Sequence, residues 1–157
     1  RGDTLVIDTK GDTRIDKPLR VEISVPELRK IEIDGSADAT VEGGRGDTEL
    51  SIEGSGAIRW TGDAGELRVE IDGSGDVKLA GSARQLRVDV SGSGDVDAKE
   101  LRAKDAAVEI EGAGDVAVHV DGGKFRAEVS GSGDVTWSGS GTVERAVVSG
   151  SGEIRKL

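Results

Sequence analysis

A chain of 157 residues is long enough for one ordinary domain, and its composition excludes several classes of protein. It has no cysteine and one histidine, so it cannot form a disulfide, a thiolate metal site or a site with two histidine ligands. Its net charge of −10 disfavours nucleic acid as a partner, because binding to phosphates requires an excess of Lys and Arg.

The first thirty residues predict an irregular cap ahead of a more regular region. Alternating apolar residues predict strands over 4–8 and 19–25. Pro18 and Pro26 have no backbone amide to donate to a neighbouring strand, so we expect them at corners or on an exposed edge. We therefore expect residues 1–30 to form irregular strands that cap a repeat region over 31–157, with both parts in one structural domain.

The region from 31 to 157 is an internal repeat. The string Gly-Ser-Gly-Asp-Val, or a near copy of it, recurs at spacings of 19 residues, with one spacing of 20. Its copies begin at Gly35, Gly54, Gly73, Gly92, Gly112, Gly131 and Gly150. A polar stretch separates the end of one unit from the next strand. This stretch is longer at 101–105, and we expect it to hold the extra residue of the one 20-residue unit.

Each unit predicts a strand, a glycine corner and a second strand. Apolar residues alternate with charged ones before the corner, as at Leu67, Val69 and Ile71, and alternation resumes after it. A period of two is typical of a strand with one buried face, and the frequent glycines argue against helices. One unit cannot bury its apolar face alone, whereas units stacked about 4.8 Å apart can.

The sequence therefore predicts an all-β fold, a single-stranded, right-handed parallel β-helix (solenoid). It should have about 19 residues per coil and roughly seven coils. The expected hand follows from the right-handed preference of parallel crossover connections. The prediction requires a buried column formed by equivalent residues of successive coils, namely Val77, Val96, Val116 and Val135.

The run from Leu19 to Asp38, LRVEISVPELRKIEIDGSAD, followed by the repeated Gly-Ser-Gly-Asp-Val, resembles the head GIN domain family of autotransporter-type adhesins. The similarity extends over roughly residues 19–157. It implies a right-handed single-stranded β-helix on a bacterial extracytoplasmic protein. It also implies cell-surface adhesion as the family's proposed role, and it supplies no catalytic motif to transfer.

An aspartate recurs after the glycine corner and forms the one candidate metal site. Asp76, Asp95, Asp115 and Asp134 would lie about one coil apart in a stack. Ca²⁺ prefers carboxylate and carbonyl oxygens, so this ladder is a candidate cation site. The competing interpretation is that each carboxylate accepts backbone amides in its own corner, as in an Asx turn. No second aspartate recurs in each unit, so we favour the structural interpretation and predict no metal site.

Catalysis has little support in the sequence. A polysaccharide-active β-helix would need paired carboxylates beside a groove, and such sites favour exposed aromatic side chains. Trp60 and Trp137 instead fall at a position that is aliphatic in other units, so we expect them in the core. His119 alternates with buried-type residues, and we expect it to be a solvated surface residue without a serine partner. We predict no catalytic residue and no cofactor.

We therefore predict a non-catalytic, extracytoplasmic bacterial β-helix domain that acts as an adhesin or as a surface binding or structural module. Two alternatives are a polysaccharide-active lyase-like or hydrolase-like β-helix and an accessory oligomerisation domain. The expected partner is a surface glycan or a protein, not nucleic acid. A naked edge at 154–157 predicts pairing with a second subunit or with more polypeptide.

The expected location is the periplasm or the bacterial cell surface. No apolar run approaches the roughly 20 residues that span a bilayer, so we expect no transmembrane segment in this chain. The sequence begins at Arg1 without a Met, and we expect that a leader has been removed.

Overall fold

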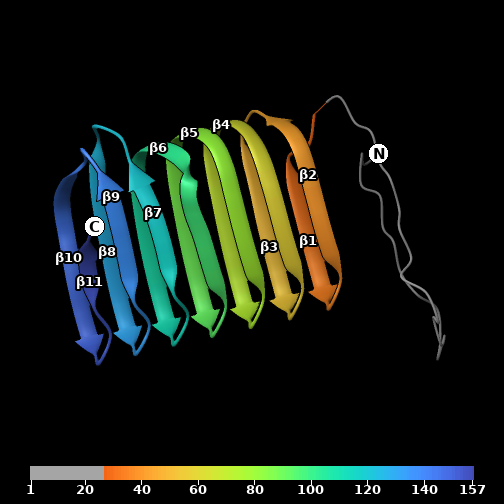
Figure 1. Cartoon of the computed structure of the whole chain (residues 1–157). Helices are drawn as coiled ribbons and strands as arrows, with labels where there is room; N and C mark the ends of the chain where they lie inside the picture. Colours follow the sequence, from red (N-terminus) through yellow and green to blue (C-terminus); the bar gives the residue numbers. More distant parts are fainter. Residues whose placement is uncertain (1–26) are drawn as a thin grey trace.

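The chain winds into a parallel β-solenoid whose turns stack along one axis (Figure 1). The structure is a computed structural model that describes residues 27–157. These residues make about 7 turns of ~19 residues each, as predicted. The expected strands over 4–8 and 19–25, and with them most of the expected cap, lie outside the described residues.

All the strands pair in parallel, each with its equivalent in the next turn. In chain order they are β1 (Lys30–Gly35), β2 (Asp38–Arg45), β3 (Thr48–Gly54), β4 (Ala57–Gly73), β5 (Asp76–Gly92), β6 (Asp95–Gly112), β7 (Val116–Val120), β8 (Lys124–Gly131), β9 (Val135–Gly139), β10 (Thr142–Gly150) and β11 (Ile154–Lys156). No helix within 27–157 has the length and apolarity needed to cross a bilayer.

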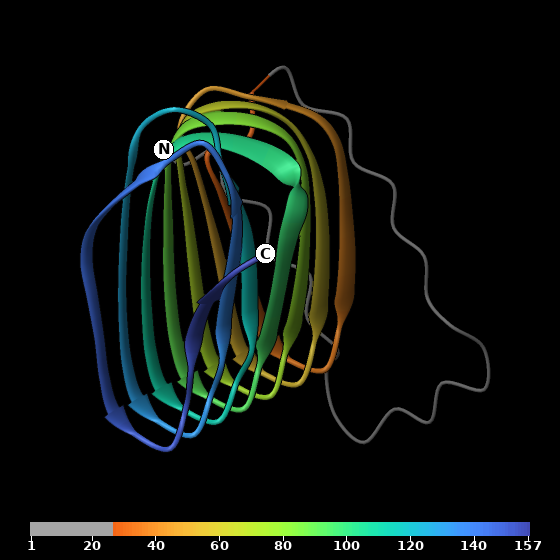
Figure 2. The same cartoon turned by 60° about the vertical axis from the view of Figure 1, so that its left-hand side comes forward.

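Each turn is a flattened loop with two long sides, and the sides of successive turns form two facing surfaces (Figure 2). We call the side that contains β1, β3, β8 and β10 the first sheet, and the side that contains β2, β7, β9 and β11 the second sheet. The long strands β4, β5 and β6 belong to both, because each enters on the second sheet and continues around into the first.

The interior consists of columns of equivalent aliphatic side chains. Val77 pairs with Val96, which pairs with Val116, which pairs with Val135, and none of the four is more than 2% exposed. The buried column that the repeat required is therefore confirmed. The right-handed coil stays a prediction.

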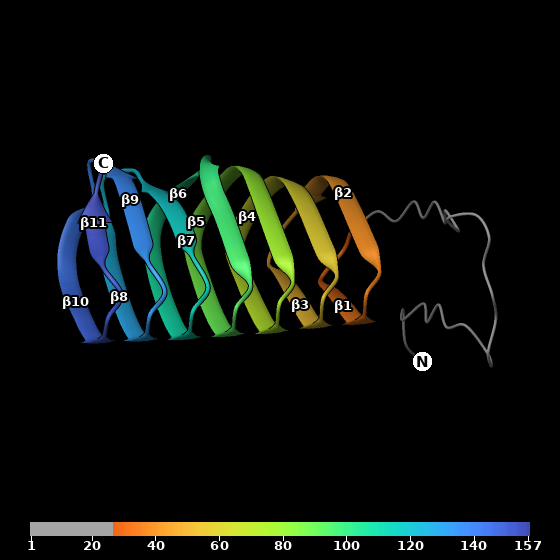
Figure 3. The ribbon, with the colours of Figure 1, turned by 60° about the horizontal axis from the view of Figure 1, so that its bottom comes forward.

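The glycine corners line up along one edge of the rod (Figure 3). At this edge adjacent turns come close enough to exclude any side chain. Gly112 has a φ of +138°, and a Cβ on it would lie 2.1 Å from the carbonyl oxygen of Gly92 in the turn before. The corner therefore requires glycine for two reasons, its backbone conformation and the space available.

The extra residue of the longer turn is not at 101–105, where the sequence placed it. Lys78 pairs with Asp97, 19 residues on, whereas Ala80 pairs with Glu100, 20 residues on, so the register shifts at 98–99. Leu101 is fully buried and pairs with Gly81 of the turn before, so it is not the extra residue in that pairing. In the pairing with β7 the register shifts again, between Ala98 and Arg102. The exposed Lys99 can be accommodated as a bulge at no cost to the core.

Candidate functional site

The aspartate ladder begins the second sheet, at the point where each turn leaves its glycine corner. The carboxylate Oδ1 of Asp95 accepts a hydrogen bond from the backbone N of Asp115 at 2.9 Å. Asp115 accepts one from Asp134 at 2.9 Å, and Asp134 accepts one from Glu153 at 2.8 Å. Each of these carboxylates therefore fastens its own turn to the next one.

The expectation that these carboxylates accept amides within their own corners is wrong. The corner amides are already used between turns, since the backbone N of Ser132 donates to the carbonyl of Gly112 at 2.8 Å. The carboxylates instead accept the first amide of the following turn. Asp105 does the same at the opposite corner, where it accepts from the backbone N of Lys124 at 2.8 Å.

Metal coordination requires several ligand side chains to converge on one point. Among residues 27–157 no group of three or more His, Cys, Asp or Glu is placed to hold a metal ion. The ladder carboxylates are spaced by the turns, and the Oδ1 atoms of Asp95, Asp115 and Asp134 bind backbone amides. That the candidate ladder of Asp76, Asp95, Asp115 and Asp134 holds no metal ion stays a prediction, and calcium titration can test it.

A shallow groove runs along the ladder on the outside of the second sheet. It consists of two open hollows of about 310 Å³ and 300 Å³ that share Asp95 and Asp97. We call it the ladder groove, and its charged lining residues are Arg59, Asp76, Lys78, Asp95, Asp97, Lys99, Asp115, Asp134 and Arg155. Acidic and basic side chains thus share one straight, solvent-accessible surface.

His119 is not the isolated surface residue that the sequence predicted. It is half-buried, and its Nδ1 lies 2.9 Å from the Oγ of Ser138 in the next turn. The two residues are 19 apart, so the repeat length itself was the signal that could have paired them. The register neighbour of His119 in the turn before is Arg102, and a guanidinium cannot orient an imidazole for catalysis as a carboxylate does.

Both tryptophans fill the core, as predicted. Trp60 is 1% exposed and Trp137 is 5% exposed. The Trp137 ring stacks on Phe125 with centroids 4.9 Å apart, and the Nζ of Lys156 lies 4.5 Å from the Trp137 ring centroid. The indole Nε1 of Trp60 has no hydrogen-bond partner among the described residues. Neither ring is therefore available as a sugar-stacking platform.

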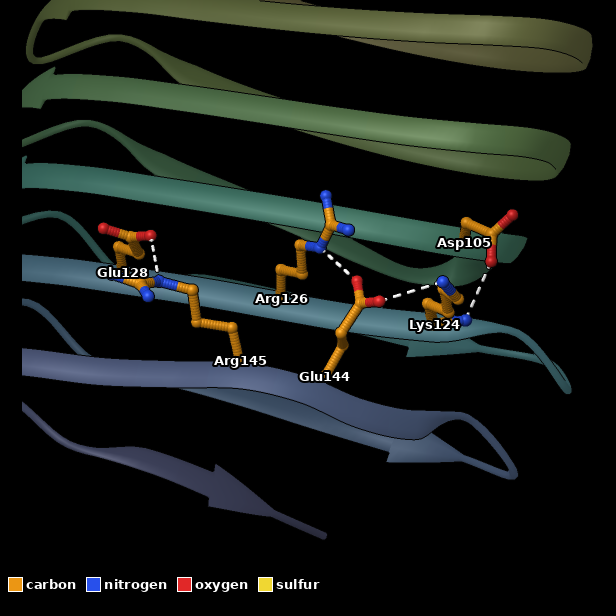
Figure 4. Close-up of polar contacts among 6 residues, drawn as sticks. All are labelled: Asp105, Lys124, Arg126, Glu128, Glu144 and Arg145. Carbon is orange, nitrogen blue, oxygen red and sulfur yellow. Dashed lines mark hydrogen bonds and ion pairs between the residues drawn. The ribbon is translucent and has the colours of Figure 1, made fainter.

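A cluster of ion pairs lies on the first sheet at the last two turns (Figure 4). Glu144, in a bulge of β10, accepts hydrogen bonds from the Nζ of Lys124 at 2.9 Å and from Arg126. Arg145 donates to Glu128 of β8. These hydrogen bonds, that of Lys124 first, lower the pKa of Glu144 below its ordinary value.

Glu144→Gln should therefore destabilise the protein at neutral pH and much less in acid. A lowered pKa means that the charged carboxylate stabilises the fold above the pKa of an unfolded glutamate, and that this stabilisation is lost as the pH falls through the folded-state value. Melting temperatures of both proteins at neutral pH and at about pH 3 check this. Glu111→Gln on the same sheet is the matched control. An equal difference at both pH values would contradict the charge explanation.

The comparisons with known proteins place the fold in a family. Residues 1–141 match the model of the family described as "Putative auto-transporter adhesin, head GIN domain". The chain belongs to this family, and the resemblance seen in the sequence is confirmed, although the match starts before residue 19 and stops short of residue 157. Membership implies an extracytoplasmic location and favours a non-enzymatic role. No curated protein matches the chain.

Solved structures share the architecture. A "putative adhesin" from Bacteroides fragilis is 28% identical with a TM-score of 0.74, over 84% of this chain and 62% of that one. A "putative lipid binding protein" from Parabacteroides distasonis is 24% identical with a TM-score of 0.74, over 83% and 56%. A "putative adhesin" from the same species is 19% identical with a TM-score of 0.68, over 83% and 64%. This chain thus spans less than two thirds of the length of these structures.

Proposed function

We propose that this domain is a non-catalytic adhesin-type module that binds a polar ligand, a surface glycan or a protein segment, along the ladder groove. It would do so in the periplasm or at the cell surface. The observation that carries the proposal is the groove itself, a straight row of acidic and basic side chains on a regular sheet. Family membership supports the adhesin role.

The shape of the groove suits an extended ligand better than a small substrate. Enzyme pockets enclose most of their ligand, whereas both hollows here are open and shallow. Equivalent side chains recur about every 4.8 Å along the rod, so a ligand lying parallel to the axis meets the same kind of contact turn after turn. Many modest contacts can then add to a useful affinity.

The chemistry of the groove favours a ligand that both donates and accepts hydrogen bonds. Lys78 and Arg59 are donors beside the acceptors Asp76 and Asp95. The second hollow repeats this combination with Arg155 beside Asp134. A hydroxyl-rich glycan or a polar peptide satisfies both groups at once, while a purely anionic polymer would face the aspartates.

A glycan array combined with a product-release assay tests the proposal. We expect binding of an extended ligand without release of product. The double variant Lys78→Ala/Arg155→Ala, which removes one cation from each hollow, should weaken that binding by roughly tenfold or more. Arg87→Ala, on the first sheet, is the matched control and should bind as the parent does.

Two results would overturn this assignment. Release of cleaved product would favour the polysaccharide-active alternative. Equal binding by the double variant and the parent would place the ligand on another surface.

A further inference from the structure

One outward-facing column of residues runs along the ladder groove. Six successive turns each contribute one residue to this column, and the six are in register, namely Arg59, Lys78, Asp97, Ala117, Thr136 and Arg155. Neighbouring strands are about 4.8 Å apart, so the column is about 24 Å long. The strands that carry it lie side by side along the rod (Figure 1). A ligand that lies along the axis therefore meets contacts at a fixed spacing.

This spacing distinguishes the two classes of ligand that the proposed function leaves open. In a peptide in β conformation, the groups on one face recur about every 6.7 Å, so they do not stay in register with the turns. A polyproline-type peptide repeats every three residues of about 3.1 Å each and meets only every second turn. In an extended β-linked glycan, each sugar ring advances by close to one turn of the solenoid. Such a glycan can therefore repeat its contacts on every turn.

Several charged side chains of the groove are available to a ligand. On the first sheet the basic side chains are taken up by ion pairs, such as that of Arg68 with Asp89 at 3.4 Å. In the groove, Lys78 and Lys99 have only longer ion pairs, of 3.7 Å and 3.8 Å. Within 27–157, Arg59 and the carboxylates of the aspartate ladder form no ion pair with one another or with any other side chain. The second sheet thus offers charges that the fold itself does not use.

The signs of these charges favour a ligand without net charge. The groove lining has four basic and five acidic side chains, so its net charge is −1. A polyanion would face the ladder carboxylates, and a polycation would face Arg59 and Lys78. A sugar hydroxyl can donate to a carboxylate and accept from a cation, and such charge-assisted hydrogen bonds are stronger than neutral ones. A neutral chain rich in hydroxyls therefore suits the whole groove.

We propose that the ladder groove binds an uncharged, β-linked polysaccharide that lies along the rod with one sugar per turn. This inference rests on the proposed function and narrows it to one class of ligand. The sugar hydroxyls donate to the second oxygens of the ladder carboxylates, whose Oδ1 atoms already accept backbone amides in three of the turns. Other hydroxyls accept from Arg59, Lys78 and Arg155.

Calorimetric titration of the 157-residue chain with uncharged β-linked oligosaccharides of glucose and of N-acetylglucosamine tests the proposal. We expect the affinity to rise with each added sugar up to six, the number of turns in the column. Raising the ionic strength from about 0.01 M to about 0.15 M should change the affinity by less than about twofold, because a neutral ligand has no charge to be screened.

Ala117→Leu places a larger side chain in the middle of the column, with three turns on one side of it and two on the other. We expect the affinity for a six-sugar ligand to fall by roughly tenfold or more, to about the value for three sugars, while the affinity for two sugars stays unchanged. Ala107→Leu is the matched control, because Ala107 is also half-buried but lies on the first sheet. It should bind as the parent does, and circular dichroism verifies that both variants fold.

The outcomes separate this inference from the proposed function. A peptide or a charged glycan that binds more tightly than the neutral series, and that loses affinity in Lys78→Ala/Arg155→Ala, would overturn the inference and leave the proposed function standing. An affinity that does not depend on the number of sugars, or a six-sugar ligand that Ala117→Leu binds as the parent does, would also overturn the inference alone. Absence of binding to every glycan and peptide would overturn both.

Discussion

Gly112→Ala should lower the free energy of unfolding by about 3–5 kcal/mol, because two independent costs add at this corner. The residue has a φ of +138°, a conformation that L-residues with a side chain rarely adopt. The new Cβ would also lie 2.1 Å from the carbonyl oxygen of Gly92, so the two turns would have to separate locally. Urea denaturation followed by circular dichroism measures the loss.

Gly122→Ala separates the two costs. Gly122 has a φ of +86°, but a Cβ on it would meet no atom within 4 Å. Only the backbone cost remains there, so we expect a loss of about 1–2 kcal/mol. Equal losses in the two variants would mean that the close approach of the turns contributes nothing, which would contradict the packing argument at the glycine edge.

Phe125→Ala should cost about 3–5 kcal/mol, comparable to other large-to-small changes in well-packed cores. Phe125 is fully buried, and its ring stacks on Trp137 at an interplanar angle of 25°. The truncation therefore loses both the apolar contact area and the aromatic pair. Urea denaturation is again the measurement.

Phe125→Leu is the matched control. It keeps most of the volume and removes only the aromatic pair, so we expect a loss below about 2 kcal/mol. If the leucine variant were as unstable as the alanine variant, the stacking with Trp137 would outweigh the buried volume of Phe125. That result would contradict the cavity argument.

The architecture was predictable because one signal repeats seven times. The alternation around Val77 indicates a strand, and the recurrence of the same pattern at Val96 and Val116 fixes which strands are neighbours. Long-range pairing is usually hidden in a single sequence. In a solenoid the period reveals it, since residue i lies beside residue i + 19.

Details that break the period could not be predicted in the same way. The register shift lies at 98–99 and Leu101 is buried, and both are properties of packing that no local pattern in the sequence predicts. The contacts of Glu144 depend on a bulge in β10, which places its partners 20 and 18 residues away instead of 19. No feature of the local sequence predicts that bulge.

The ladder groove was visible in the sequence only as scattered charges. Each turn contributes one to three charged residues to it, such as Lys78 from β5 and Arg155 from β11. They become one surface only after stacking. The pairing of His119 with Ser138 was missed for a different reason. The alternation pattern predicts which side chains point into the core and which point to solvent, but it does not predict which residue lies beside them in the next turn.

The hydrogen bonds between turns all run along the rod, and this has a mechanical consequence. Force applied to the two ends of the chain acts first on the hydrogen bonds of the outermost turn, because each turn is bonded only to its immediate neighbours. The turns would then peel away singly, and each would release about 60 Å of slack chain at roughly 3.3 Å per residue. A solenoid of this kind is therefore expected to unfold turn by turn under force instead of in a single step.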